Sequence, residues 1–264
     1  MNSSDLEGLT IRATDGDLGK VSQLYFDDES WAIRYLVVET GGWLSGRRVL
    51  ISPFSILRAD WSDKSLHVAL TKQQVEHSPD IDTHQPVNRQ HEATYLGYYG
   101  YPSYWGGPYL WGASFYPMVP PPPAEITGDS LAQKIGRESV DSHLRTSEEV
   151  IGYGIEATDG EIGHLAKFIV DDEAWAIRYL EVATQNWWPG KKVLLSPNWV
   201  KHVSWAESKV YVALARNVIQ TCPEYDETIP VSREYENRLY FHYGQPPYWL
   251  LEAKHKPSLA MSGV

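Results

Sequence analysis

The chain has little cysteine, no basic excess and no long hydrophobic run, and each absence excludes a class of protein. Cys222 is the only cysteine, so no intrachain disulfide can form, as is usual in a reducing compartment. Acidic residues outnumber basic ones by 34 to 23, which disfavours nucleic acid, because phosphates must be neutralised by Lys and Arg. No apolar run approaches the roughly 18 residues of a spanning helix, and Met1–Asp5 has no signal-peptide pattern. We therefore expect a soluble, cytoplasmic protein without a direct membrane span.

Signatures of catalysis are also lacking. The nine histidines show no metal-ligand spacing, and the nucleophile elbow, the phosphate-binding glycine loop and the dinucleotide fingerprint are absent from the sequence. Cys222 has no Cys–His–Asn arrangement around it. We therefore expect no catalytic residue, no cofactor and no metal ligand, and predict that the chain is not an enzyme.

What the chain does contain is the same stretch twice, at a fixed offset of 144 residues. Trp31–Leu36 and Trp175–Leu180 are identical, and 38 of the 95 positions from 11 to 105 match the residue 144 places later. Such self-similarity indicates two homologous domains. We predict domains at 1–82 and 147–226, an aromatic and Gly/Pro-rich extension with a linker at 83–146, and a C-terminal extension at 227–264.

Each copy has the pattern of short β-strands separated by turns. In the first copy, β-branched and aromatic runs bounded by Asp-Gly, polar and Pro turns predict strands at 9–14, 19–26, 31–39, 47–51, 54–61 and 65–70. One or two helical turns follow at 71–77, whereas 82–105 continue the repeat without a regular pattern. Strands this short and closely spaced favour a small closed barrel, because closure removes exposed edges. The predicted fold class is mainly all-β, with two tandem small β-barrels.

The two copies also predict which side of the best strand is buried. Val37 is replaced by Glu181 in the second copy, while Leu36 and Val38 keep their identity. Because side chains alternate along a strand, we expect Leu36 and Val38 to point inward and Val37 outward. Arg34 and its equivalent Arg178 share the inward parity.

The order of these motifs resembles the PRC-barrel family. In the first copy the matching elements are the turn Asp15–Gly19, the pair Asp27-Asp28, the strand Trp31–Leu36 and the segment Val49–Pro53. In the second copy they are Asp159–Gly163, Asp171-Asp172, Trp175–Leu180 and Val193–Pro197. The resemblance covers roughly residues 5–80 and 149–224.

The resemblance implies a small β-barrel that serves as an interaction module without a catalytic centre. The family occurs in the cytoplasmic domain of the photosynthetic reaction centre H subunit and in the C-terminal domain of a ribosome maturation factor. We expect this chain to have neither the anchor of the first nor the N-terminal domain of the second, and to be similar to bacterial stand-alone members. Fold follows from such a likeness more securely than function.

The densest charges have two interpretations. The runs Asp27–Glu29 and Asp171–Glu173 are either a divalent-cation site or turns between strands, and the turn is favoured because Ca²⁺ needs six to eight oxygen ligands. Arg34 and Arg178 either pair with these carboxylates or present a charge to a partner, and pairing is favoured because a buried unpaired Arg is costly.

Aromatic loops are the other candidates. Trp43, Trp187 and Trp188 fall in equivalent Gly- or Pro-containing loops, where an exposed Trp is a plausible contact anchor or, alternatively, a lid on the barrel end. The aromatic segment, defined as residues 95–116, holds ten aromatic residues and either docks across the domains or binds an extended ligand.

Together these features predict a non-enzymatic protein-interaction adaptor. Its partner would be another protein, at a membrane or in a large assembly, met through Trp43, Trp187, Trp188, Arg34 and Arg178. The alternatives are a small-molecule or ion-binding module, and an assembly factor like the reaction centre H subunit, by family analogy alone. A hydrolase using the Asp clusters is a third class, which we disfavour because adjacent Asp side chains point apart.

Overall fold

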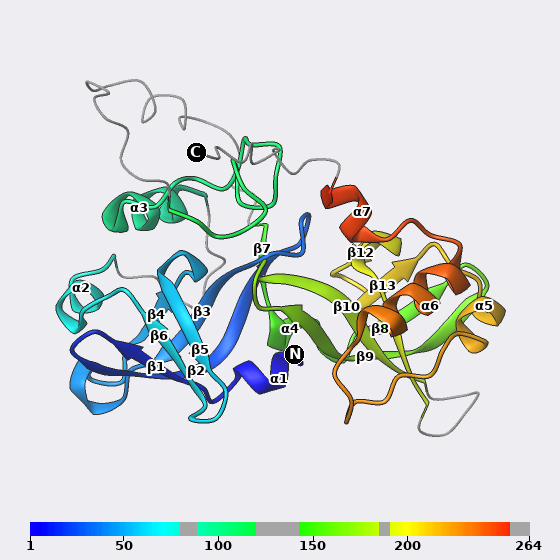
Figure 1. The fold of residues 1–264 in the computed structure, drawn as a ribbon, viewed down its shortest axis with the longest axis horizontal. Helices are drawn as coiled ribbons and strands as arrows, with labels where there is room; N and C mark the ends of the chain where they lie inside the picture. Colours follow the sequence, from blue (N-terminus) through cyan, green and yellow to red (C-terminus); the bar gives the residue numbers. More distant parts are fainter. Residues whose placement is uncertain (80–88, 120–142, 185–190, 254–264) are drawn as a thin grey trace, which may run out of the picture. The chain divides into compact units, whose positions relative to one another are not determined.

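The computed structural model describes residues 1–79, 89–119, 143–184 and 191–253 (Figure 1). Its contacts divide the chain into two compact units. Unit 1 comprises Met1–Gly152 and Ala166–Leu180, and unit 2 comprises Tyr153–Leu165 and Glu181–Val264.

The first sheet carries the predicted strands nearly residue for residue. They are β1 (Thr10–Ala13), β2 (Gly16–Asp27), β3 (Ile33–Glu39), β4 (Arg48–Ile51), β5 (Ile56–Asp60) and β6 (Ser65–Val68). The hydrogen-bonded order is β4-β3-β2-β1-β6-β5, with β1 and β6 parallel, and β7 (Leu144–Thr146) pairs with β2 off this path. The short helical segments that accompany these strands are α1 (Ser3–Leu6), η1 (Gly41–Leu44), η2 (Pro53–Ser55), α2 (Lys72–Glu76) and α4 (Ser147–Val150).

The second sheet repeats this topology. Its strands are β8 (Gly154–Ala157), β9 (Gly160–Asp171), β10 (Ala176–Thr184), β11 (Lys192–Leu195), β12 (Val200–Ser204) and β13 (Lys209–Val212), in the order β11-β10-β9-β8-β13-β12. The helical segments are η4 (Pro197–Trp199), α5 (Arg216–Gln220), α6 (Arg233–Tyr243) and α7 (Tyr248–Ala253). The chain is therefore mainly β, with two barrel-like sheets, as the sequence predicts.

One glycine in each sheet allows two neighbouring strands to approach closely. Gly19 has φ +156, and a Cβ there would overlap the carbonyl of Glu39 on β3. Gly163 has the same conformation, and a Cβ there would overlap the carbonyl of Ala183. Only glycine allows the two backbones to approach this closely. Leu18, Leu24 and Leu36 then fill the core of the first sheet at 0–1% exposure.

The prediction that Val37 lies on an unburied side of β3 is wrong, because both faces of this strand are covered. Leu36, Val37 and Val38 are all fully buried. Tyr35 shares the parity of Val37 and packs against Tyr95 of a helix, α3 (Arg89–Tyr99), which accounts for the burial of that face. Glu181, at the position of Val37, is fully buried as well, and its Oε1 lies 3.1 Å from Nζ of Lys192.

Within unit 1, a short segment before each repeat pairs with a strand of the other repeat. Strand β7 pairs with the end of β2, with Thr146 opposite Tyr25. At the positions offset by 144 residues, Asn2 pairs with Ile169 of β9. Residues 166–180 therefore belong to the second repeat by sequence and to unit 1 by contacts, and the compact units do not coincide with the predicted domain ranges.

A second pair of contacts in unit 1 has the same reciprocity. Ala32 and Ala176, which are equivalent positions, form an antiparallel bridge. Ile33 N donates to Trp175 O and Ile177 N donates to Trp31 O, both at 2.8 Å. Under the 144-residue offset the bridge is its own counterpart and the two hydrogen bonds are counterparts of each other, as in an isologous interface.

Among the described residues, no helix is long and apolar enough to cross a membrane. The longest helices there, α3 and α6, have 11 residues each.

Candidate interaction surface

The first acidic turn is organised by Asp27 at the end of β2. Its Oδ1 accepts hydrogen bonds from the backbone N–H groups of Glu29 (3.1 Å) and Ser30 (2.9 Å), which closes the turn. Its Oδ2 lies 3.5 Å from Nη2 of Arg34 on β3. Both oxygens of this buried carboxylate are thus engaged in holding the turn to the neighbouring strand.

The second copy builds the same turn around Asp171. Its Oδ1 accepts from the backbone N–H groups of Glu173 (3.0 Å) and Ala174 (3.1 Å), and its Oδ2 accepts from Nη2 of Arg178 (2.8 Å). Burial acts to raise the pKa of Asp171, but the Arg178 charge and the backbone hydrogen bonds outweigh it and hold that pKa below the ordinary value. The favoured interpretation, Arg–Asp pairing in a turn, is therefore seen in both copies.

Arg34 is enclosed by the aromatic segment. Its Nη1 donates to the carbonyl of Leu110 (2.8 Å), and its guanidinium lies 3.7 Å from the ring centroid of Tyr104 and 4.8 Å from that of Trp111. The side chain is 3% exposed, and burial lowers its pKa against the opposing pull of Tyr104 and Asp27. A cation close to aromatic rings is stabilised by their π electrons. Arg178, by contrast, is 13% exposed.

The aromatic segment docks onto unit 1. Trp111 is 2% exposed, packs edge-on against Phe54, and donates its indole N–H to the carbonyl of Ala174 (2.8 Å). Tyr101 also packs against Phe54. The described contacts of the stretch 95–116 therefore extend the core of unit 1, within the range 83–146 where the sequence predicts an aromatic and Gly/Pro-rich extension with a linker.

A buried acid on α3, which sequence reasoning missed, ties this segment to the sheet. Glu92 is 2% exposed, and its Oε1 accepts hydrogen bonds from the hydroxyls of Tyr35 (3.1 Å) and Tyr104. Nη1 of Arg89 lies 3.5 Å from its Oε2. Burial raises the pKa of Glu92, and these donors and cations only partly offset it.

The signal that identifies this cluster is the repeat itself. Arg89, Glu92, Tyr104 and Trp105 recur at the 144-residue offset as Arg233, Glu236, Tyr248 and Trp249. In unit 2, Nη1 of Arg233 lies 3.0 Å from Glu236, and the hydroxyl of Tyr248 donates to Glu236 (3.2 Å). The guanidinium of Arg233 also lies 4.0 Å from a ring centroid of Trp249. The same polar clamp thus secures a covering helix in each copy.

Trp43 lies on η1 and contacts β2 of the first sheet. Its indole N–H donates to the carbonyl of Leu18 (2.6 Å), and Nζ of Lys72 lies 5.4 Å from its ring. The side chain is half-buried, so part of the ring faces solvent. The hydrogen bond to Leu18 agrees with the interpretation of Trp43 as a lid on the end of the barrel. Because part of the ring is exposed, contact with a partner stays a prediction. Trp187 and Trp188 lie outside the described residues.

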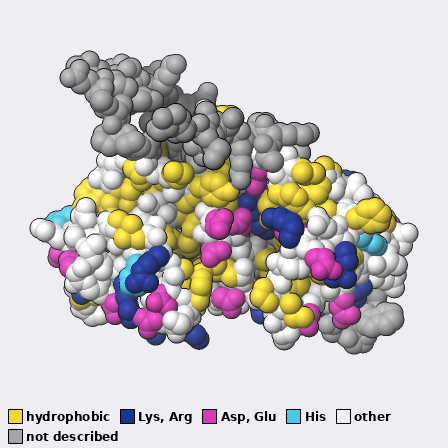
Figure 2. All heavy atoms as spheres, viewed as in Figure 1, with side chains coloured by type: hydrophobic (Ala, Val, Ile, Leu, Met, Phe, Trp, Pro, Cys, Tyr) yellow, Lys and Arg dark blue, Asp and Glu magenta, His cyan; other side chains and the backbone are white. Residues whose placement is uncertain are grey.

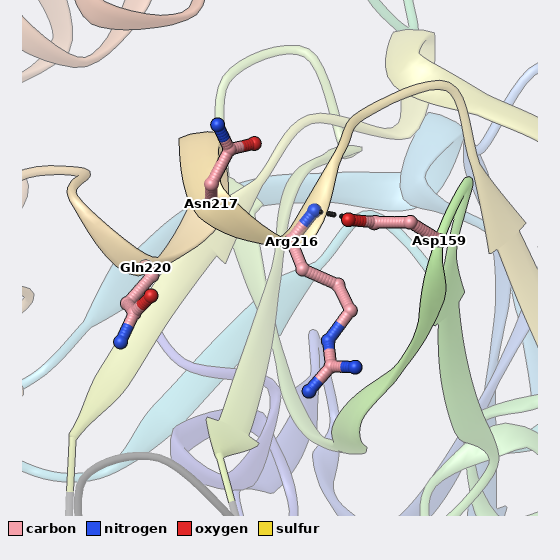
Figure 3. Close-up of a pocket in the computed structure, with 4 residues that line it drawn as sticks. All are labelled: Asp159, Arg216, Asn217 and Gln220. Atoms are coloured by element: carbon pink, nitrogen blue, oxygen red, sulfur yellow. Dashed lines mark hydrogen bonds between the residues drawn. The ribbon is translucent and has the colours of Figure 1, made fainter.

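A polar pocket of about 420 Å³ lies in unit 2 (Figure 3). It is lined by Asp159, Arg216, Asn217 and Gln220, and the backbone N–H of Arg216 donates to Oδ1 of Asp159 (2.7 Å). Lys72 N donates to Asp15 in the same way in unit 1 (2.8 Å). The pocket therefore offers one carboxylate, one guanidinium and two side-chain amides.

The described residues contain no group of three or more His, Cys, Asp or Glu side chains placed to hold a metal ion. Cys222 is 4% exposed, and burial raises the pKa of its thiol. On the face in Figure 2, acidic and basic side chains occur in small mixed groups between apolar patches. Among the described residues, the large apolar side chains with the highest exposure are Phe241 (89%) on α6 and Leu57 (66%) on β5.

Residues 1–74 match the model of the PRC-barrel domain family. Among curated proteins, none matches the chain. The matched range holds β1 to β6 of the first sheet, and the six-stranded second sheet repeats their order. Residues 1–74 are a PRC-barrel domain, and the later sheet of the chain is consistent with a second barrel-like domain.

Proposed function

We propose that the chain is a non-enzymatic protein-interaction module built from duplicated barrel-like domains. The observation that carries the proposal is that the candidate ionisable side chains make structural contacts within the fold. Asp27, Arg34, Asp171 and Arg178 hold turns and strands together, and Glu92 holds a helix. A general acid or base must instead face a substrate.

The proposed contact surface is the Trp43 loop with its equivalent at Trp187 and Trp188. Trp is enriched among residues that dominate binding energy, because one large ring buries much area. Trp43 is anchored through its N–H to Leu18, which reduces the entropy lost when a partner covers the exposed ring. Of the two arginines predicted to contact a partner, Arg178, which pairs with Asp171, is more exposed than Arg34.

The test is affinity capture of the tagged chain from its native cell, with soluble and membrane fractions analysed separately by mass spectrometry. We expect one dominant protein partner with the wild-type chain. Trp43→Ala with Trp187→Ala and Trp188→Ala is expected to weaken binding by about 2 kcal/mol or more, roughly thirtyfold. Trp61→Ala is the matched control, because Trp61 is 43% exposed and lies outside these loops.

Retention of the partner by the folded triple variant would exclude this surface. A partner found in the membrane fraction would support a membrane-bound assembly, which the likeness to the reaction centre H subunit favours. A partner found in the soluble fraction alone would support a cytoplasmic assembly.

A small-molecule or ion-binding role is the second candidate, and the pocket beside Arg216 favours it. A thermal-shift panel of metabolites and metal ions tests this role, because a ligand that binds the folded state raises the unfolding midpoint by mass action. An upward shift that Gln220→Ala abolishes would support the pocket. Equal shifts in both proteins would exclude it.

A further inference from the structure

Two short segments of this chain share one sequence pattern and one structural role. Residues 2–6 read Asn-Ser-Ser-Asp-Leu, and residues 146–150 read Thr-Ser-Glu-Glu-Val. We call this pattern the docking motif: a capping Asn or Thr, a serine, a polar residue, an acid and an aliphatic residue. In both segments the serine and the aliphatic residue are buried and the two residues between them are exposed.

The first docking motif is seated on β9 within unit 1. Ser3 Oγ accepts a hydrogen bond from the backbone N–H of Phe168 (3.2 Å), and the backbone N–H of Val170 donates to the carbonyl of Met1 (2.7 Å). Leu6 is fully buried. The seat thus combines strand backbone groups with an apolar site for one aliphatic side chain, as in β-strand addition.

The second docking motif is seated on β2 in the same way. Ser147 Oγ accepts from the backbone N–H of Leu24 (3.2 Å), Thr146 pairs with Tyr25, and Val150 is fully buried. Because the polar contacts of both seats are made to backbone groups, they depend little on the side chains of the seat. The two seats therefore accept segments that differ at four of five positions.

Each docking motif also holds its own turn. The backbone N–H of Asn2 donates to Oδ2 of Asp5 (3.0 Å), and the backbone N–H of Glu149 donates to Oγ1 of Thr146 (3.1 Å). Such local caps favour the seated conformation before binding, which lowers the entropy lost on docking.

We propose that the docking motifs are exchangeable between molecules, so that the seats on β9 and β2 bind the docking motif of a second copy of this chain. A second copy is the partner that fits, because every copy carries two docking motifs and two matching seats. Exchange forms the same contacts in the oligomer as in the single chain, which makes segment swapping a low-cost route to association. This surface is separate from the Trp43 loop, so either proposal can fail alone.

One experiment vacates a seat. The full chain without residues 2–7 is titrated into a fluorescein-labelled peptide of residues 1–9, and fluorescence anisotropy is measured. We expect saturable binding, weakened about tenfold or more by Ser3→Val or Leu6→Asp in the peptide. A Ser4→Ala peptide is the control, because Ser4 is exposed, and it should bind like wild type.

A second experiment uses the intact chain in two differently tagged forms, incubated together and captured through one tag. Co-capture of the second tag, reduced by excess peptide, is expected. Absence of co-capture would overturn the exchange, whether or not the shortened chain folds. Peptide binding that is equal for the wild-type and Leu6→Asp sequences would also overturn it, because the seat would not recognise the docking motif.

Discussion

Arg34 shows how one residue links the acidic turn to the aromatic segment. It pairs with Asp27, donates to the carbonyl of Leu110 and lies against Tyr104. Removing one partner of a buried ion pair leaves the other charge uncompensated, which is more costly than never having the pair.

We therefore expect Arg34→Ala to lower the free energy of unfolding by about 3–5 kcal/mol, measured by urea denaturation. Arg48→Ala is the control: its pair with Glu39 is 40% and 52% exposed, so the expected loss is within about 1 kcal/mol. Equal losses in the two variants would contradict the role assigned to burial.

Glu92 predicts a pH dependence. Burial raises the pKa of Glu92 above its ordinary value, so the folded state binds the proton more tightly than the unfolded state does. Its contribution to stability is complete below the unfolded pKa and is lost as pH rises through the folded pKa. We expect the unfolding free energy of Glu92→Gln, relative to wild type, to increase as pH is raised from about 4 through the raised pKa. Denaturant titrations at a series of pH values check this, and a constant difference would refute it.

At the scale of elements, helix α3 completes the edge of the first sheet. The hydroxyl of Tyr95 donates to the carbonyl of Leu50 (2.9 Å) and accepts from the backbone N–H of Ser52 (3.2 Å). These groups lie on and just after β4, at the end of the strand order, so one side chain replaces the hydrogen bonds of a missing neighbour strand.

Tyr95→Phe is expected to lower the free energy of unfolding by about 1–3 kcal/mol, because a buried donor and a buried acceptor lose their partner. Tyr98→Phe tests the same chemical change at a site that is 42% exposed, where the hydroxyl bonds to Gln74, and a much smaller loss is expected. Urea midpoints of the two variants distinguish the cases.

At the scale of the whole molecule, the reciprocal contacts make unit 1 depend on both repeats. Trp31 and Trp175 have φ of 57° and 50°, a left-handed conformation that is unusual for a bulky residue. It persists where surrounding contacts over-determine it. Here the Ala32–Ala176 bridge and its two flanking hydrogen bonds are those contacts.

We expect Ala176→Asp to reduce hydrogen-exchange protection of the Ile33 amide as well as that of Ile177, although Ile33 lies in the other repeat. The reason is that the bridge brings both amides to carbonyls of the opposite repeat. Ala213→Asp, at an exposed position, should leave both amides protected. Loss of protection at Ile177 alone would show that the bridge is not shared.

The repeat in the sequence was enough to predict two similar mainly-β domains and, in the first, strands within a few residues of those observed. It also favoured the pairing of Arg34 with the Asp27 turn, because a buried cation requires a nearby acid. These predictions succeeded because period-two patterning, turn residues and charge pairing act over short distances along the chain.

Tertiary structure decided the rest. Helix α3 is rich in Tyr and contains Gly97, which are poor helix formers, so its stability comes from packing that local pattern does not show. The burial of Val37 likewise depends on a helix more than 50 residues away in sequence. Segments 1–6 and 144–150 bind mainly backbone groups of β9 and β2, which every strand sequence provides. The sequence therefore determined the strands, and only the fold determined which segment covers each one.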